Sequence, residues 1–119
     1  MWRVLTTLEF DNWYSNLDPD SQAEIIGKVE LLKGLGPRLG RPHADTLNGS
    51  KHPNMKELRA ATQEKVLRIA FAFDPNRAAV LLVAGDKSGM SQSQFYRQLI
   101  AKADRLYDAH LRTIREQHK

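Results

Sequence analysis

The sequence predicts an α+β protein with the element order β-α-α-β-β-β-α, in which the helices pack on one face of a largely antiparallel sheet. Three observations lead to this fold class. Two stretches of helical periodicity come early, three apolar segments typical of strands follow, and an amphipathic helix ends the chain. Of the 119 residues, 41% are hydrophobic and 27% charged, so we expect a single globular domain over residues 1–119.

Residues 1–33 predict a short strand followed by a helical hairpin. Trp2, Val4 and Leu5 fit the strand. Helical spacing then relates the apolar side chains of Phe10, Trp13, Tyr14 and Leu17. Asp18 is a favourable N-cap, and Pro19 a favourable first residue, for a second helix. The apolar stripe of this second helix consists of Ile25, Ile26, Val29 and Leu32. We expect the hairpin to cover the sheet.

Residues 34–54 predict a basic loop. Glycine and proline recur so often in this segment that they interrupt any regular pattern. The segment is also cationic, with Arg38, Arg41, His43, Lys51 and His52. Loops of this length in a compact domain are usually functional or mobile, and we expect the same here.

Residues 55–90 predict antiparallel strands. Residues 55–60 fit a strand and residues 61–65 a turn. The next strand alternates, with Leu67, Ile69, Phe71 and Phe73 on one face and Val66, Arg68, Ala70 and Ala72 on the other. A tight turn at residues 74–77 leads to an apolar run at residues 78–84, typical of a central strand buried on both faces. We expect the face that carries Arg68 to be open.

Residues 91–119 predict the C-terminal helix. Its apolar stripe consists of Phe95, Tyr96, Leu99, Ala103, Leu106, Tyr107, Leu111 and Ile114. Asp108 and Arg112 have the spacing of a stabilising ion pair on one helix face. His110 lies beside the stripe, and we interpret it as a partly buried histidine that is held by a hydrogen bond.

Charge and composition narrow the function classes. The formal net charge is +4, but residues 1–33 carry a net −3 and residues 34–119 a net +7. A basic second part favours an anionic partner such as nucleic acid, although a solvated surface has the same composition. The absence of cysteine excludes disulfides, thiolate metal sites and cysteine nucleophiles. With no apolar run of about 20 residues and no secretory signal at the start, we expect a cytoplasmic protein without a membrane partner.

A set of cations stands out on the predicted strands. Lys56, Arg59, Arg68 and Lys87 come from strands or strand ends of one sheet, His52 precedes the first of them, and Tyr96 opens the last helix. Such a set can cleave a phosphodiester without a metal: a base deprotonates the ribose 2′-hydroxyl, cations stabilise the phosphorane, and an acid protonates the leaving 5′-oxygen. The histidines lack the spacing of metal ligands, so no metal or other cofactor is expected.

Each of these residues also has a purely structural interpretation. Arg59 could pair with Glu57 or Glu64, the hydroxyl of Tyr96 could face solvent from a core position, and Lys87 could be a solvated strand end. The functional interpretation therefore rests on the set as a whole.

The motifs around these residues resemble the RelE/ParE toxin superfamily, in its phage Gp49-like/HigB branch of type II toxin–antitoxin toxins. The resemblance covers about residues 47–111. It rests on the segments 56–59 (KELR), 67–75 (LRIAFAFDP) with Arg77, 81–89 (LLVAGDKSG), 95–96 (FY) and 103–111 (ADRLYDAHL).

This resemblance implies a RelE-like fold and a toxin that inhibits translation by metal-independent cleavage of mRNA, usually on the ribosome. It also implies a cognate antitoxin, often with a helix-turn-helix domain, through which the pair touches operator DNA. Carried over by motif, Arg59 and Arg68 would bind phosphate, and Lys87 would bind phosphate or transfer a proton. Tyr96 would orient a base or move a proton. Asp86 stands where the family usually has a second lysine, and it would either orient Lys87 or Arg68 or indicate a weakened nuclease. Peripheral contacts to RNA are assigned to Lys51, His52, Lys56 and Arg77.

Two other functions remain open at this point. A ParE-type toxin of the same fold would inhibit gyrase, and the cations would then contact a protein. A phage accessory protein would bind RNA or a partner without catalysis.

Overall fold

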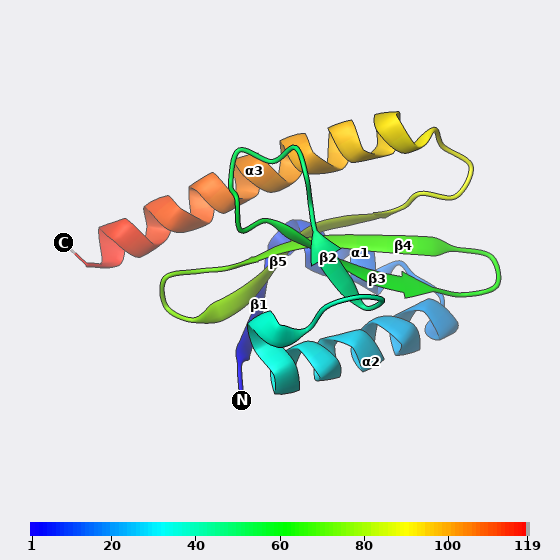
Figure 1. Cartoon of the computed structure of the whole chain (residues 1–119), viewed down its shortest axis with the longest axis horizontal. Helices are drawn as coiled ribbons and strands as arrows, with labels where there is room; N and C mark the ends of the chain where they lie inside the picture. Colours follow the sequence, from blue (N-terminus) through cyan, green and yellow to red (C-terminus); the bar gives the residue numbers. More distant parts are fainter. Residues whose placement is uncertain (119) are drawn as a thin grey trace.

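The computed structural model describes residues 1–118 and shows an α+β fold built on one five-stranded sheet (Figure 1). The sheet has the strand order β1-β5-β4-β3-β2, and all neighbouring strands are antiparallel except β1 and β5. The elements are β1 (Arg3–Thr6), α1 (Leu8–Ser15), α2 (Pro19–Leu35), β2 (Ala44–Thr46), β3 (Lys56–Ala61), β4 (Val66–Phe73), β5 (Ala78–Asp86) and α3 (Gln92–Gln117). This arrangement confirms the predicted fold class. Lys119, the last residue of the predicted C-terminal segment, lies outside the described residues.

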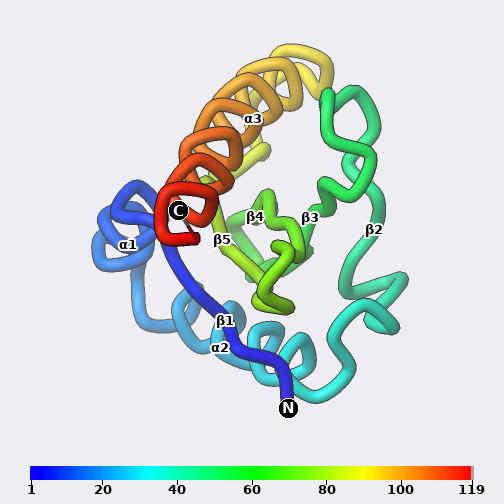
Figure 2. Tube along the Cα trace, turned by 90° about the vertical axis from the view of Figure 1, so that its left-hand side faces the viewer, coloured from blue at the N-terminus to red at the C-terminus, as the bar shows by residue number. Residues whose placement is uncertain are grey.

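The helices cover both faces of the sheet, so the prediction that they share one face is wrong. Helices α1 and α2 pack on the face of Leu67, Ile69 and Phe71. Helix α3 packs on the opposite face, against Ala70 and Ala72 of the same strand. Figures 1 and 2 show α3 and α2 on opposite sides of the strands. The face predicted to be open is therefore covered by α3 along much of its length.

The centre of the sheet follows the predicted alternation. In β4 the large apolar residues all point toward α1 and α2, while the small ones point toward α3. Strand β5 is buried on both faces from Ala78 to Leu82, as its continuous apolar sequence predicts. The β4–β5 register shifts between Ala70 and Phe71, which marks an irregularity in an otherwise regular hairpin.

Residues 34–54 hold more structure than the predicted loop. Helix α2 continues to Leu35 and ends at Gly36, whose φ of 56° is a conformation that favours glycine. A Cβ atom at this position would lie 2.2 Å from the Trp2 indole nitrogen, so the close packing of Trp2 also requires glycine. A 3₁₀ turn at Gly36–Arg38 and the short strand β2 follow. Strand β2 was missed because three residues are too few to establish a period.

Helix α3 begins at a capped N-terminus after the five residues that follow β5. Ser91 is its N-cap and accepts a hydrogen bond from the Gln94 amide. The helix crosses the sheet with Phe95, Leu99 and Ala103 buried against it. None of the helices in residues 1–118 combines the length and apolar character needed to cross a membrane.

Candidate functional site

Two arginines face each other across the β3–β4 pair. The strand register places Arg59 directly opposite Arg68, and both point to the α3 face because Leu58 and Leu67 beside them point to the other. Like charges in opposite positions repel, so this pair needs a counter-charge. The neighbour of Arg68 on β5 is Gly85, on which the Phe95 ring packs so closely that a Cβ there would lie 3.0 Å from Phe95 Cε1.

Glu57 supplies the counter-charge and is the centre of the cluster. Its side chain is only 5% exposed. One carboxylate oxygen accepts hydrogen bonds from Arg59 Nε and Nη2 at 3.0 and 2.9 Å. The other oxygen accepts the hydroxyl of Tyr96 at 2.7 Å and lies 3.7 Å from Arg68 Nε. A single buried carboxylate thus hydrogen-bonds Arg59 and Tyr96 and forms an ion pair with Arg68, whose buried Nε has no hydrogen-bond partner among the described residues.

Lys87 completes the cluster from the end of β5. Its amide donates to the Val66 carbonyl at 2.8 Å, which extends the β4–β5 ladder by one residue. Its ammonium nitrogen lies 5.7 Å from the centre of the Tyr96 ring, and no carboxylate of residues 1–118 lies within ion-pair distance. Burial, followed by the charge of Arg68, lowers the pKa of Lys87. Among the three cations of the cluster, Lys87 is therefore the one that gives up a proton most readily.

Tyr96 has the opposite tendency. Burial, followed by the hydrogen bond to Glu57, raises the pKa of its hydroxyl. The phenol thus stays protonated near neutral pH and donates a hydrogen bond to Glu57, which suits a residue that orients the cluster. The structure brings together all four residues predicted as catalytic, Arg59, Arg68, Lys87 and Tyr96.

Four residues predicted to contact RNA lie elsewhere. Lys56 alternates with Glu57 and therefore projects to the other face of the sheet. Arg77 is in the β4–β5 turn, at the opposite end of β4 from Arg68, where its guanidinium stacks 4.9 Å from the centre of a Trp2 ring. Lys51 and His52 both bind Asp108 in the middle of α3. None of the four joins the cluster.

Two other expectations are corrected by the hydrogen bonds. The carboxylate of Asp86 accepts the amides of Val66 and Ser88 and the hydroxyl of Ser88, so it fixes the turn after β5 instead of orienting Lys87 or Arg68. Asp108 pairs with the loop residues Lys51 and His52, where we expected a pair with Arg112. The expected hydrogen bond of His110 is present, to Asp74 at 2.8 Å.

Glu57 is the residue of the cluster that sequence reasoning missed as a functional candidate. It entered only as a possible partner of Arg59. The signal was nevertheless available, because Glu57 and Arg59 share a strand face while Leu58 and Ala60 between and after them are apolar. A charged pair on one face of a strand that is otherwise buried indicates an internal ion pair.

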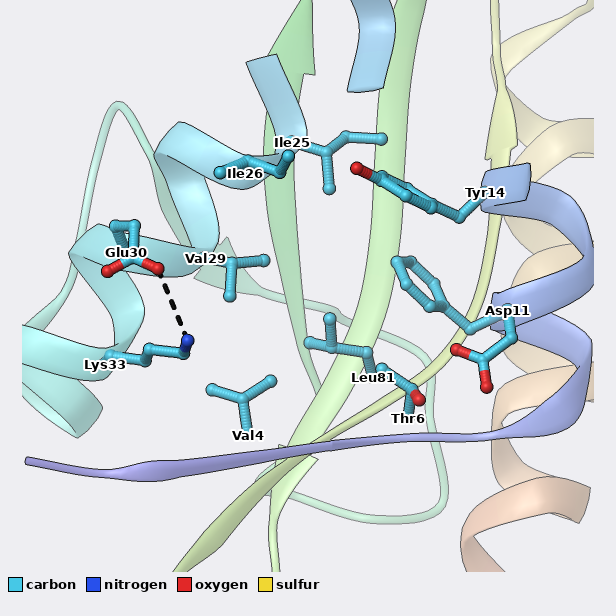
Figure 3. Close-up of a pocket in the computed structure, with 11 residues that line it drawn as sticks. Val4, Thr6, Asp11, Tyr14, Ile25, Ile26, Val29, Glu30, Lys33 and Leu81 are labelled. Atoms are coloured by element: carbon cyan, nitrogen blue, oxygen red, sulfur yellow. Dashed lines mark hydrogen bonds and ion pairs between the residues drawn. The ribbon is translucent and has the colours of Figure 1, made fainter. Parts of the chain in front are cut away.

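The most apolar pocket lies on the other side of the sheet and has no such chemistry. It encloses about 320 Å³ between β1, α1 and α2, and Figure 3 shows Leu81, Ile25 and Val29 along its walls. Its charged side chains are at the margin, where Lys33 pairs with Glu30 at 3.3 Å. Catalysis needs polar groups that converge on one point, whereas the walls of this pocket consist mostly of apolar side chains.

The Glu57 cluster can therefore bind an oxyanion and move a proton. Three cations face the carboxylate of Glu57 and, at the edge of the cluster, that of Asp45, 3.4 Å from Arg59. The net charge remains positive at this partly buried position, which favours a phosphate group. Arginine binds phosphate through paired N–H donors, and a lysine with a lowered pKa can exchange a proton. A phosphodiester is the ligand that fits both properties.

Comparisons with known proteins place the chain in a family. Residues 12–108 match the family model described as "Phage derived protein Gp49-like (DUF891)". Two proteins of Mycobacterium tuberculosis (strain ATCC 25618 / H37Rv), named as the candidate toxins HigB2 and HigB3, are similar to the chain. HigB2 is 43% identical over 100 residues, which are 83% of this chain and 49% of HigB2. HigB3 is 45% identical over 86 residues, which are 72% of this chain and 74% of HigB3. The chain thus spans about half the length of one of these relatives.

A solved structure is similar in fold. It is E. coli toxin RelE in the free state, carrying two arginine-to-alanine substitutions, with a TM-score of 0.57 and 9% sequence identity. The match covers 85% of this chain and 95% of that one. At this identity the likeness concerns the fold alone.

Proposed function

The chain belongs to the Gp49-like family of phage-derived proteins, and on this premise we propose that it is the toxin of a bacterial type II toxin–antitoxin pair that cleaves mRNA. The family match confirms the resemblance found in the sequence motifs. The observation that carries the nuclease proposal is the convergence of Arg59, Arg68 and Lys87 around Glu57. The two relatives named as candidate toxins support it.

The proposed reaction uses the cluster without a metal. Arg59 and Arg68 bind the non-bridging oxygens of the scissile phosphate and stabilise the additional charge of the phosphorane. Lys87, with its lowered pKa, accepts the proton of the ribose 2′-hydroxyl, whose oxygen attacks the phosphorus. The bond to the 5′-oxygen breaks, and that oxygen takes up a proton from the ammonium so formed or from water. Glu57 and Tyr96 keep the cations in place.

The same proposal includes the partners implied by the family. A cognate antitoxin, which we expect to carry a helix-turn-helix domain, neutralises the toxin and brings the pair to operator DNA. The substrate is mRNA on the ribosome in the cytoplasm.

The test is cleavage of a defined mRNA in a translating bacterial extract, read by primer extension. Purified wild-type protein should generate new 5′ ends. Arg68→Ala and Lys87→Ala should each reduce the cleavage rate by about 100-fold or more, which is the usual effect of removing one group that stabilises the transition state. Arg38→Ala, which removes an exposed arginine next to α2, should leave the rate unchanged and serves as the matched control.

Circular dichroism and thermal unfolding must show that the variants are folded. A folded wild-type protein that yields no new ends in the extract would contradict the nuclease proposal. A supercoiling assay with purified gyrase, run on the same preparation, would then decide whether the protein is the ParE-type inhibitor.

A further inference from the structure

Helix α3 separates its charges by side. Five basic side chains are exposed on it and have no carboxylate within 4.0 Å among residues 1–118; these are Arg97, Lys102, Arg105, Arg112 and Arg115. Of the three acidic residues of the helix, Asp104 and Asp108 are only partly exposed, and the exposed Glu116 lies in the last turn beside Arg115, so five exposed cations face one exposed carboxylate. The solvent side of α3 is thus strongly basic.

The loop before β3 binds the two partly exposed acidic residues, Asp104 and Asp108. The hydroxyl of Ser50 and the amide of Lys51 donate to Asp104. The ammonium of Lys51 and the Nε2 atom of His52 contact Asp108, the latter at 2.8 Å. Figure 1 shows this loop reaching across to α3. Because the carboxylates are engaged by the loop, they offer little compensation for the cations on the solvent side.

The cations form one continuous surface. With 3.6 residues per turn, they occupy an arc of about 140° opposite the buried stripe of Phe95, Leu99 and Ala103. Arg97 and Arg115 are about 27 Å apart along the axis, at 1.5 Å per residue. The surface begins at Arg97, the residue that follows Tyr96 of the Glu57 cluster. A strand bound at the cluster therefore has basic surface to continue on.

We propose that the exposed face of α3 binds the sugar–phosphate backbone of the RNA next to the cleavage site. The position of the RNA next to a cleavage site rests on the proposed nuclease function. The charge pattern of α3 does not depend on that function. A regular polyanion suits a surface of spaced cations that is continuous over about five helical turns. A membrane suits it poorly, because the large apolar side chains exposed in residues 1–118 all lie outside α3.

The test compares two triple variants that remove the same charge. One is Arg97→Gln/Arg105→Gln/Arg112→Gln on α3. The other is Arg3→Gln/Lys33→Gln/Arg38→Gln, at the end of the molecule where β1 begins and α2 ends. The probe is a fluorescein-labelled single-stranded RNA of 20 nucleotides, and fluorescence anisotropy gives Kd at several salt concentrations.

The α3 variant should lower the slope of log affinity against log salt by about 2, because each cation contributes about 0.7 for a single strand. At 0.1 M salt this corresponds to roughly 100-fold weaker binding. The control triple should bind with the slope of the wild type. If the α3 triple fails to fold, Arg105→Gln alone should lower the slope by about 0.7.

Two results would separate this inference from the nuclease proposal. Equal slopes for the two triple variants would overturn the α3 surface, whatever the cleavage assay shows. An α3-dependent slope in a wild-type protein that cuts no mRNA would support the surface and contradict only the nuclease. Arg68→Ala, used as a cleavage-deficient protein, should still bind with an α3-dependent slope.

Discussion

The two faces of the sheet differ in the size and charge of what they carry. The face under α1 and α2 presents large apolar side chains from β4, including Leu67, Ile69 and Phe71. The face under α3 presents Ala70 and Ala72 toward the middle and far end of the strand, with Arg68 near its start. The same strand therefore contributes the core on one side and the candidate site on the other.

This difference explains where α3 can lie. Small side chains let the helix approach the strands closely at Ala70 and Ala72, where Ala103 and Leu99 pack. Beyond them the arginines prevent such contact, and the helix offers the hydroxyl of Tyr96 to Glu57 instead. The cluster is thus a polar continuation of an apolar interface. If so, substitutions in the apolar contacts should mainly lower stability, and substitutions in the cluster should also lower activity.

The largest effect is expected from the apolar face. Phe71 is 1% exposed, and Phe71→Ala should lower the free energy of unfolding by about 4 kcal/mol, from lost burial and the cavity left behind. Leu99→Ala, on the α3 face, should lower it by about 3 kcal/mol if α3 belongs to the core. Urea unfolding followed by circular dichroism measures both. A loss below about 1 kcal/mol for Leu99→Ala would show that α3 is only loosely attached, since a buried leucine normally contributes more.

Glu57→Gln is expected to affect both stability and activity. The amide keeps the shape of the side chain but removes the buried counter-charge that Arg59 and Arg68 share, and it leaves Arg59 with the partly exposed Asp45 at 3.4 Å. We expect a loss of about 2 kcal/mol, below the 3–5 kcal/mol typical of a broken buried pair, because Arg59 is partly exposed and water screens it.

The matched control is Glu64→Gln, an exposed glutamate in the β3–β4 turn, which should change stability by less than about 0.5 kcal/mol. Cleavage in the translating extract should fall in Glu57→Gln and remain normal in the control. An unchanged unfolding free energy in Glu57→Gln would mean that the arginines do not depend on this carboxylate.

The sequence predicted the strands better than the placement of the helices. The alternation in β4 determines which residues share a face, and this local property identified Arg68 as facing away from the large apolar side chains. It contains no information about which helix covers which face. The stripe of α3 would fit either face, so the assignment of all helices to one face had no support in the residues themselves.

The candidate site shows the same division. Arg59 and Arg68 meet because neighbouring strands in a hairpin have a predictable register. Strand geometry could also have excluded Arg77, because the five residues from Arg68 to the end of β4 at Phe73, at about 3.3 Å each, already place the following turn about 16 Å away. The pairing of Lys51 and His52 with Asp108 joins residues 56 or 57 positions apart, and nothing in local sequence predicts it.

The smallest expected effect is a change in the pKa of Lys87. It tests whether the charges of Arg68 and Lys87 influence each other. Burial and the charge of Arg68 both disfavour the ammonium, so the pKa of Lys87 lies below 10.5 in the folded protein. In Arg68→Met one of these causes is removed and the other remains. The pKa should therefore rise but stay below 10.5. Reductive ¹³C-methylation of the lysines followed by NMR titration gives this value directly, with Lys87→Arg to assign the signal.

The control for this titration is Arg112→Met, which removes a cation from the exposed side of α3 and should leave the Lys87 signal where it was. The sign of the change is decisive. If the Lys87 pKa falls or stays constant in Arg68→Met, the charge of Arg68 does not lower it. The lowered pKa of Lys87 would then not result from the neighbouring cation. If it rises, the pH dependence of the residual cleavage by Arg68→Met should move to higher pH together with the pKa, because deprotonated Lys87 is the form that accepts the 2′-hydroxyl proton.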